Sequence, residues 1–205
     1  MARCTPEQAL QTRESLLDAA LEVFAEEGVA RPSLTKVAER AGMTRGAIYG
    51  HFRNKADLFN ALCDRYLFPA EVLEQMREEG AEDPLGTLRA WVARITHANT
   101  TDPQRQKLLS VLFLRVEATE GSDILDRLRD NADKVHFHEK ELMRLAVARG
   151  QLPADLDVEG ASLALTAWLG GLLRMIALCP ERDWASIAPG MGEAVLEGLL
   201  RGPEP

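Results

Sequence analysis

The sequence predicts an all-α protein of two domains. Helical periodicity runs through nearly the whole chain, and no stretch shows the sustained two-residue alternation of a half-buried β-strand. The chain has 205 residues, of which 46% are hydrophobic, so it is long enough to form a real core, and a disordered chain is excluded. Helix-ending signals, including Gly28 and Gly80, divide the periodic pattern into segments of ordinary helix length.

The first 54 residues are predicted to form a domain of three helices. An apolar stripe over 16–24 marks the first helix, and Gly28 supplies its C-terminal stop. Ser33 and Thr44 have the side chains of N-caps and begin two short helices, which are separated by a turn around Gly42. The remaining residues, 55–205, are predicted to form the second domain.

The second domain is predicted to consist of longer helices. The first of them runs from Lys55 to about Glu79, with a kink at Pro69, because proline has no N–H to donate to the carbonyl of Arg65. Pro189 is expected to break or delay the last helix. The further helices are expected over 84–100, 103–119, 123–149, 156–178 and 185–201.

Cysteine usage and hydropathy favour a cytoplasmic protein. Cys4, Cys63 and Cys179 lie too far apart for a zinc knuckle or a redox pair, and their odd number argues against a disulfide framework. The N-terminus lacks the apolar core of a signal peptide. The most apolar run, 161–179, is interrupted by Arg174 and falls short of a free-standing membrane span, so we expect an interface helix and no membrane partner.

Positive charge is concentrated in one stretch of an acidic chain. The formal net charge is -8, yet residues 31–55 hold six basic residues against the single acid Glu39, which gives this stretch +5 and the rest -13. Because salt screens charges beyond about 8 Å, an acidic protein can still bind nucleic acid through a local basic surface. The six basic residues are Arg31, Lys36, Arg40, Arg45, Arg53 and Lys55.

The same stretch, "SLTKVAERAGMTRGAIYGHF", has the spacing of a helix-turn-helix. Its second helix begins at Thr44, where Gly46 and Ala47 allow close approach to a major groove and Arg45 can reach a guanine edge. Donors for phosphate come from Tyr49, His51 and Lys55.

Three motifs in this region resemble the DNA-binding domain of the tetracycline-repressor (TetR) family: "FxxxG" at 24–28, "LTKVAERAGMTRGAIY" at 34–49 and "HFxNK" at 51–55. The resemblance implies a DNA surface made by Thr35, Thr44, Arg45, Gly46, Tyr49, His51 and Lys55. Where these relatives usually carry Trp, this chain has Gly50, and the missing ring is expected to weaken local packing and one backbone contact. The later stretches "DPLG" and "GQLPADLD" extend the likeness to multidrug-efflux repressors of the AcrR and TtgR type.

The second domain offers candidates for a ligand cavity. The segment 107–118 is apolar nearly all round, as a helix surrounded by other helices must be. Each candidate also has a plainer explanation as core packing, and Glu117 and Arg174 could orient a ligand or close an ion pair. The candidates are Tyr66, Trp91, Ile95, Leu112, Phe113, Glu117, Trp168 and Arg174.

Neither an enzyme nor a metal site is indicated. His136 and His138 lie two residues apart and point to different faces of a helix. No Asp, Glu, Ser or Cys stands in a recognisable catalytic arrangement, and Gly170-Gly171 follows no strand, so no phosphate-cradling loop is predicted. We expect no catalytic residues and no cofactor.

A homodimer is expected, because one short recognition helix reads too few base pairs for useful specificity. The candidate interface is formed by the last two helices, where small residues permit close approach and a stripe repeats every four residues. The small residues are Gly160, Ala164, Gly170 and Gly171, and the stripe consists of Ile187, Met191, Val195 and Leu199.

The predicted function is a ligand-responsive repressor that binds a palindromic double-stranded operator as a dimer. The family resemblance implies control of a multidrug-efflux operon and release by a small hydrophobic or aromatic compound. The helix from Lys55 to about Glu79 would couple ligand to DNA. The alternatives are a regulator of the same fold that senses a metabolite or signalling molecule, and a helical carrier or enzyme whose basic patch is incidental.

Overall fold

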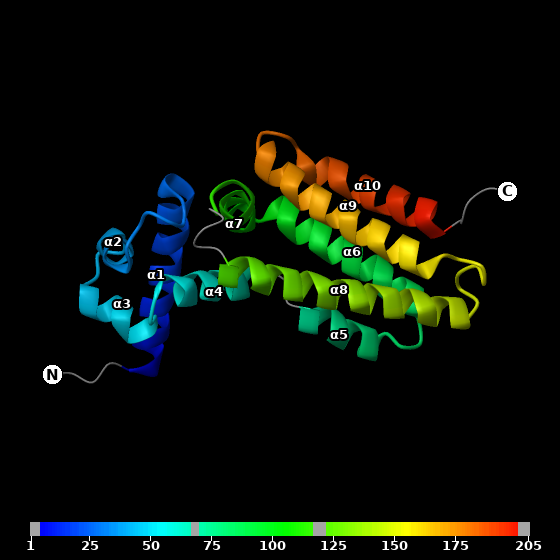
Figure 1. Ribbon diagram of the computed structural model, residues 1–205, viewed down its shortest axis with the longest axis horizontal. Coiled ribbons are helices and arrows are strands. Elements are labelled where there is room, and N and C mark those ends of the chain that lie inside the picture. The colour runs from blue at the N-terminus through cyan, green and yellow to red at the C-terminus, as the bar shows by residue number, and fades with distance from the viewer. Residues whose placement is uncertain (1–4, 67–69, 117–121, 201–205) are drawn as a thin grey trace. The chain divides into compact units, whose positions relative to one another are not determined.

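The computed structural model describes residues 5–66, 70–116 and 122–200 (Figure 1). These residues form ten α-helices and no strand, which confirms the all-α prediction. The chain divides into two compact units, one made of 1–67 and 107–126 and the other of 68–106 and 127–205. The functional boundary placed after residue 54 is a different kind of division and stays a prediction.

The first unit contains four helices that are continuous in sequence and most of a fifth. Residues with the predicted capping side chains begin two of them, since the hydroxyls of Ser33 and Thr44 accept from the backbone N–H of Lys36 and Ala47, both at 3.3 Å. The core of this unit includes Leu17 and Phe24, and the Phe24 ring centre lies 5.9 Å from that of the equally buried Phe59. Its helices are α1 (Pro6–Glu27), α2 (Leu34–Arg40), α3 (Arg45–His51), α4 (Lys55–Tyr66) and most of α7 (Pro103–Leu114).

The predicted helix from Lys55 to Glu79 is present as two helices. α4 ends at Tyr66 and belongs to the first unit, while α5 (Ala70–Glu79) belongs to the second. Pro69, where a kink was expected, lies outside the described residues. A proline cannot donate to the carbonyl four residues earlier, which is a physical reason for an α-helix to stop before it.

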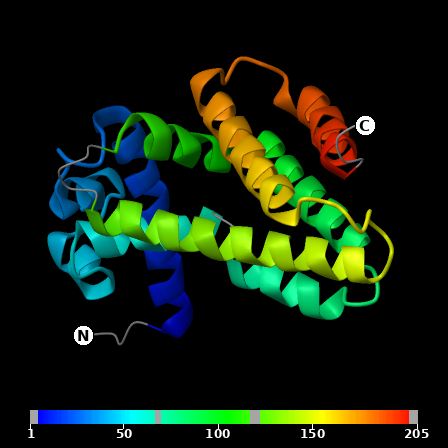
Figure 2. The same cartoon turned by 45° about the vertical axis from the view of Figure 1, so that its right-hand side comes forward.

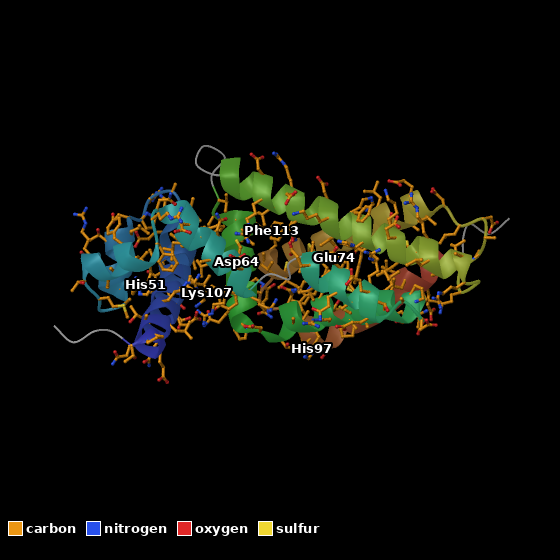
Figure 3. The ribbon with its side chains drawn as sticks, turned by 90° about the horizontal axis from the view of Figure 1, so that it is seen from below. His51, Asp64, Glu74, His97, Lys107 and Phe113 are labelled. Atoms are coloured by element: carbon orange, nitrogen blue, oxygen red, sulfur yellow. The ribbon has the colours of Figure 1, made fainter. Side chains whose placement is uncertain are left out.

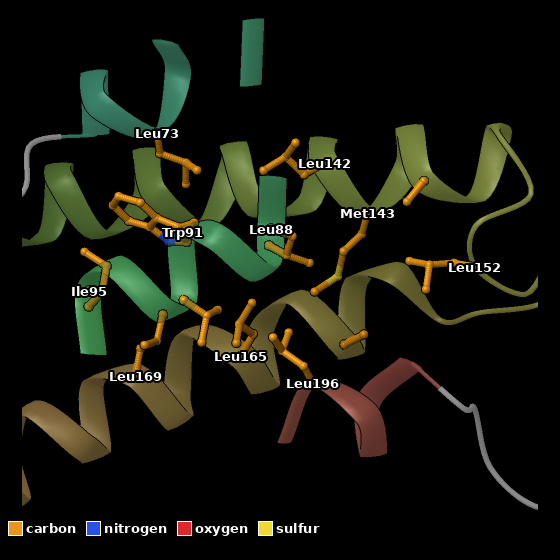
Figure 4. Close-up of a cluster of buried hydrophobic side chains, with 13 residues drawn as sticks. Leu73, Leu88, Trp91, Ile95, Leu142, Met143, Leu152, Leu165, Leu169 and Leu196 are labelled. Carbon is orange, nitrogen blue, oxygen red and sulfur yellow. The ribbon is translucent and has the colours of Figure 1, made fainter. Parts of the chain in front are cut away.

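The second unit is a bundle around α6 (Pro84–Thr101), which contacts α5, α9 (Val158–Leu178) and α10 (Trp184–Leu200). Figure 2 shows α9 and α10 side by side over α6, with α8 (Ser122–Ala148) completing the bundle. By length and composition α9 could cross a membrane, yet it packs against α6 and α10 and buries one face, as a core helix does. Figure 4 shows the core cluster, whose large members include Trp91, Leu142, Met143, Leu165 and Leu169.

Two predicted boundaries are wrong. The helix expected to reach residue 119 ends at Leu114, where the Arg115 carbonyl instead accepts from the N–H of Val29 at 3.4 Å. Pro189 neither breaks nor delays α10, which begins at Trp184 after Asp183 accepts from the N–H of Ser186. The carbonyl that loses its partner belongs to Ala185, which is exposed, so water can replace the missing N–H.

Candidate functional site

The outer face of α3 brings together most of the predicted DNA-contacting residues. Its inward side buries Ile48, and Phe52 follows at 2% exposure, which anchors the short helix against the unit. The residues on its outer side are exposed: Thr44, Arg45, Gly46 and Tyr49.

Arg45 and Tyr49 form a pair on this surface. The Arg45 guanidinium lies 5.4 Å from the centre of the Tyr49 ring, one helical turn away, so the ring restricts the arginine without burying it. Gly46 has no side chain, and the atom nearest to an added Cβ would be the Thr44 hydroxyl oxygen at 3.8 Å. The backbone of the first turn of α3 is therefore open to close approach. The surface therefore has an exposed cation beside a stretch that another molecule can approach closely.

The remaining predicted residues are less exposed. Thr35, Ala47, His51 and Lys55 are half-buried. The ring centre of His51, labelled in Figure 3, lies 6.3 Å from that of Phe52, and the two rings are tilted by 48°. The Lys55 ammonium donates to the Ala30 carbonyl, so this side chain also ties the start of α4 to the segment before α2.

The basic stretch is less positive than the count over 31–55 indicates. Lys36 pairs with Glu27 at 2.6 Å, and Arg40 donates twice to Glu26, at 2.6 and 3.0 Å. The hydrogen bond from Arg40 lowers the pKa of Glu26 and in turn raises the pKa of the arginine. Both acids lie on α1, just before the counted stretch, so only the fold shows this pairing. Arg31, Arg45 and Arg53 form no ion pair with any residue that the structure describes.

Gly50 stands at an open position. It is exposed, and a Cβ built there would meet nothing within 4 Å. A Cβ alone would therefore fill no packing gap, and the expectation that the missing aromatic ring weakens local packing stays a prediction, because a ring reaches farther than a Cβ. What the glycine changes is the outer surface and the stiffness of α3.

The predicted ligand-binding residues divide between the two units. Trp91 and Ile95 belong to the core cluster of the second unit (Figure 4). Trp168 packs against this cluster. Arg174 is exposed on α9. Tyr66, Leu112 and Phe113, the last labelled in Figure 3, belong to the first unit, and Glu117 lies outside the described residues. Their common role in a ligand site remains a prediction.

Sequence reasoning missed the most unusual residue of the second unit, Glu139. This α8 side chain is 0% exposed, and its two carboxylate oxygens accept from the Trp91 indole N–H at 3.1 Å and from the Thr166 hydroxyl at 2.8 Å. Burial raises the pKa of Glu139 to about 7, against the lowering effect of these two hydrogen bonds. A signal was present: Glu139 lies four residues after Val135 and three before Leu142, on the apolar seam of an otherwise charged helix.

The two neighbouring histidines lie in different surroundings, as their spacing predicts. His136 reaches the Thr166 hydroxyl through Nδ1 at 3.3 Å and Glu159 through Nε2 at 3.7 Å. His138 is buried, and this burial, assisted by the positive charge of Arg77, lowers its pKa.

A cavity of about 380 Å³ lies between α6 and α10, and none of the predicted ligand-binding residues lines it. Its rim carries the ion pair between Arg89 and Glu193. A Cβ at Gly192 would come within 3.2 Å of both Trp168 and Val92, so the glycine lets α10 sit close to its neighbours. The cavity is lined by Arg89, Val92, Ala93, Thr96, His97, Pro189, Gly192, Glu193 and Leu196.

The outer faces of α9 and α10 are apolar and rich in small residues. A Cβ at Gly170, Gly171, Gly190 or Gly198 would meet nothing within 4 Å, so packing inside the chain does not require glycine there. Of the predicted stripe, Ile187 and Met191 are 43% and 39% exposed, Val195 is half-buried and the Leu199 side chain is not described. Exposed large apolar residues of α9 continue this face: Leu163, Met175 and Leu178.

Two family models match the chain. The model of the bacterial regulatory proteins of the tetR family matches residues 16–62, which include α2 and α3. The model of the C-terminal region of MAATS-type transcriptional repressors matches residues 83–197.

Curated relatives match over most of their length. The HTH-type transcriptional regulator TtgR of Pseudomonas putida is 37% identical over 184 residues, which are 88% of this chain and 87% of the relative. The HTH-type transcriptional repressor BepR of Brucella suis biovar 1 is 35% identical over 173 residues, 83% of each chain.

Solved structures agree with these matches. NalD, the secondary repressor of the MexAB-OprM multidrug efflux pump in Pseudomonas aeruginosa, superposes with a TM-score of 0.82 at 31% identity and covers 96% of this chain and 100% of its own. SmeT in complex with triclosan gives 0.73 at 30% identity and covers 90% of each chain. Sequence, helix-turn-helix and fold agree, and the chain belongs to the tetR family of bacterial transcriptional regulators.

Proposed function

We propose that this chain is a homodimeric, ligand-released repressor of a multidrug-efflux operon, acting in the cytoplasm without a cofactor or catalytic reaction. The observation that carries the proposal is the outer face of α3, where Arg45 and Tyr49 are exposed beside Gly46, which has no side chain to hinder approach. Efflux control is supported by NalD and by SmeT, described as the repressor of the SmeDEF multidrug efflux pump of Stenotrophomonas maltophilia. A small aromatic inducer is supported by the complex of SmeT with triclosan.

On the DNA surface, the proposal assigns two roles. The first turn of α3, with Thr44, Arg45, Gly46 and Ala47, reads base edges in the major groove. Phosphate contacts that fix the orientation of the domain come from Thr35, Tyr49, His51 and Lys55.

Dimerisation is assigned to the outer faces of α9 and α10. Glycine inside an exposed helix lowers helix stability by up to about 1 kcal/mol relative to alanine. Four glycines of α9 and α10 are in open space, so no contact within one chain explains why they are not alanine. A second copy of the chain that packs closely on this face would explain the glycines, because they let two helices approach one another.

Met191→Glu should then place an unpaired charge in the interface and give monomers with little operator affinity. Ala185→Glu, at an exposed position on another face of α10, is the matched control, and an unchanged dimer in sedimentation of Met191→Glu would count against the interface.

Selection of bound fragments from genomic DNA tests the whole function. We expect palindromic sites beside genes for an efflux pump, with binding that weakens steeply as salt rises. Binding without sequence preference would refute the repressor assignment. Palindromic sites beside unrelated metabolic genes would replace the efflux assignment with a metabolite-sensing one.

A further inference from the structure

The cavity between α6 and α10 has no part in the proposed function. Its volume of about 380 Å³ lies near the lower end of the roughly 300–1,000 Å³ of pockets that hold small ligands. Ala93 on α6 and Gly192 on α10 leave room for it, because neither side chain extends beyond a methyl group. With about 3.6 residues per helical turn, Glu193 and Leu196 lie on the side of α10 opposite Met191. The cavity is therefore separate from the face assigned to dimerisation.

Thr96 leaves a polar atom unsatisfied in the wall of this cavity. The residue is 2% exposed, and its buried hydroxyl oxygen has no hydrogen-bond partner among the described residues. The other three threonines of α6 each donate to the backbone carbonyl four residues earlier, as threonines in helices commonly do: Thr87, Thr100 and Thr101. Thr96 does not make this bond, so a polar group of a bound molecule would satisfy its hydroxyl.

Two opposite charges lie side by side on the rim of the same cavity. The Arg89 guanidinium of α6 donates to the Glu193 carboxylate of α10, and the two side chains are 37% and 52% exposed. Because an exposed ion pair contributes little to stability, exchanging it for two new ion pairs costs the fold little. A ligand with one negative and one positive group can pair with both residues at once and leave no charge unpaired.

An apolar wall separates these charges from the unpaired hydroxyl. Thr96 follows Arg89 by seven residues, which is about 10 Å along the axis of α6. The apolar lining includes Val92 and Ala93 of α6 and Leu196 of α10. The cavity thus has a charged end, an apolar middle and a polar end.

These three parts fit one chemical class of ligand. The charged pair is complementary to the carboxylate and ammonium of an amino acid, and the apolar wall is suited to an aromatic ring. At the polar end, His97, labelled in Figure 3, adds its ring nitrogens to the lining beside Thr96. We propose that the cavity binds a zwitterionic aromatic α-amino acid, with its carboxylate on Arg89, its ammonium on Glu193 and a polar ring substituent on Thr96.

This site goes beyond the proposed function, because its lining includes no residue assigned to DNA or to the inducer. Binding is tested on the full chain by calorimetric titration with four probes. L-tyrosine carries all three recognised groups. Tyramine lacks the carboxylate, 3-(4-hydroxyphenyl)propionate lacks the ammonium, and L-phenylalanine lacks the ring hydroxyl.

We expect L-tyrosine to bind about fivefold more tightly than tyramine or the propionate, because each of these lacks one partly exposed ion pair. It should also bind about fivefold more tightly than L-phenylalanine, which leaves the Thr96 hydroxyl unpaired. Tyramine or propionate binding as tight as that of L-tyrosine would reject the zwitterionic ligand.

Thr96→Val tests the polar end, since it keeps the shape of the side chain and removes the hydroxyl. This variant should bind L-tyrosine and L-phenylalanine equally. Thr100→Val is the matched control: it removes a hydroxyl that donates to the Thr96 carbonyl and does not line the cavity, so it should keep the wild-type preference. A preference for L-tyrosine that persists in Thr96→Val would refute the contact.

Ala93→Phe tests the location of the site by filling the cavity from an exposed position, so the core is left intact. We expect it to lower L-tyrosine affinity by at least about tenfold. Ala90→Phe, also exposed on α6 but outside the lining, should bind as wild type, and far-UV circular dichroism verifies that both variants are folded.

Absence of L-tyrosine binding, or equal affinity in the wild type and Ala93→Phe, would overturn the inference. Operator binding by the same preparations is measured in parallel. A wild type that binds operator but not L-tyrosine rejects the amino-acid site alone. A wild type that binds L-tyrosine with the expected probe order but binds no operator rejects the proposed function alone.

Discussion

The two units use charge in opposite ways. On α3 of the first unit, Arg45 is exposed and braced by the Tyr49 ring, so it costs the fold little and is available to another molecule. In the second unit, Glu139 is fully buried with neutral partners, so its ionisation is coupled to the packing of α6, α8 and α9. A change at the exposed Arg45 should therefore alter binding with little effect on stability, whereas a change around Glu139 should alter the stability of the second unit.

The largest effect is expected from Trp91→Ala, which would show how far the second unit depends on its core. Losing the indole leaves a cavity and removes a donor from Glu139, so the free energy of unfolding should fall by about 3 to 5 kcal/mol. Trp91→Phe, which retains most of the volume, should lose less. Thermal unfolding followed by far-UV circular dichroism measures both, and a loss below about 1 kcal/mol for Trp91→Ala would contradict the assigned packing.

The pH dependence of stability sharpens the contrast further. The folded pKa of Glu139, raised to about 7, lies above its ordinary value of 4.5, so between these values the folded state holds a proton that the unfolded state has lost. The contribution of Glu139 to stability is therefore fully present below about pH 4.5 and is lost as the pH rises through about 7. Between pH 5 and pH 8 we expect the wild type to lose about 2 to 3 kcal/mol relative to Glu139→Gln.

Denaturant unfolding followed by tryptophan fluorescence measures this loss, because all three tryptophans, Trp91, Trp168 and Trp184, lie in the second unit. Parallel curves for the two proteins from pH 5 to pH 8 would show that Glu139 titrates normally.

Arg45→Ala should separate binding from stability. We expect operator affinity to fall by about 1 to 3 kcal/mol with relaxed preference at one base pair, while the free energy of unfolding changes by less than about 0.5 kcal/mol. Lys55→Ala should weaken all DNA sequences alike and also lower stability, because the ammonium donates to the Ala30 carbonyl. Unchanged base preference in Arg45→Ala, measured by competition with operator variants, would remove the assignment.

The smallest effect is expected at Gly50. Alanine in place of this glycine should stabilise α3 by about 0.5 to 1 kcal/mol, since a Cβ there meets nothing. Gly192→Ala is the instructive opposite, because its Cβ would press on Trp168 and Val92 at 3.2 Å and should destabilise the second unit. A Gly192→Ala variant more stable than the wild type would show that α10 does not pack closely on Trp168 and Val92.

Local sequence patterns were enough to predict most of the helices and the exposed outer residues of α3. Caps such as Ser33 and Thr44 and the apolar stripes are local patterns, so the helices they begin and bury follow without knowledge of distant neighbours. The outer residues of α3 could be predicted for the same reason, since exposure of a short helix follows from which face is apolar.

Only the tertiary structure decided which charges are free and which residue is buried with a charge. Glu26 and Glu27 neutralise Arg40 and Lys36 across two helices, so a count along the chain overstates the basic patch. Glu139 becomes exceptional because α6 and α9 close over it with Trp91 and Thr166. Pairing and desolvation depend on distances between segments far apart in sequence, and the local pattern that fixes a helix carries no record of them.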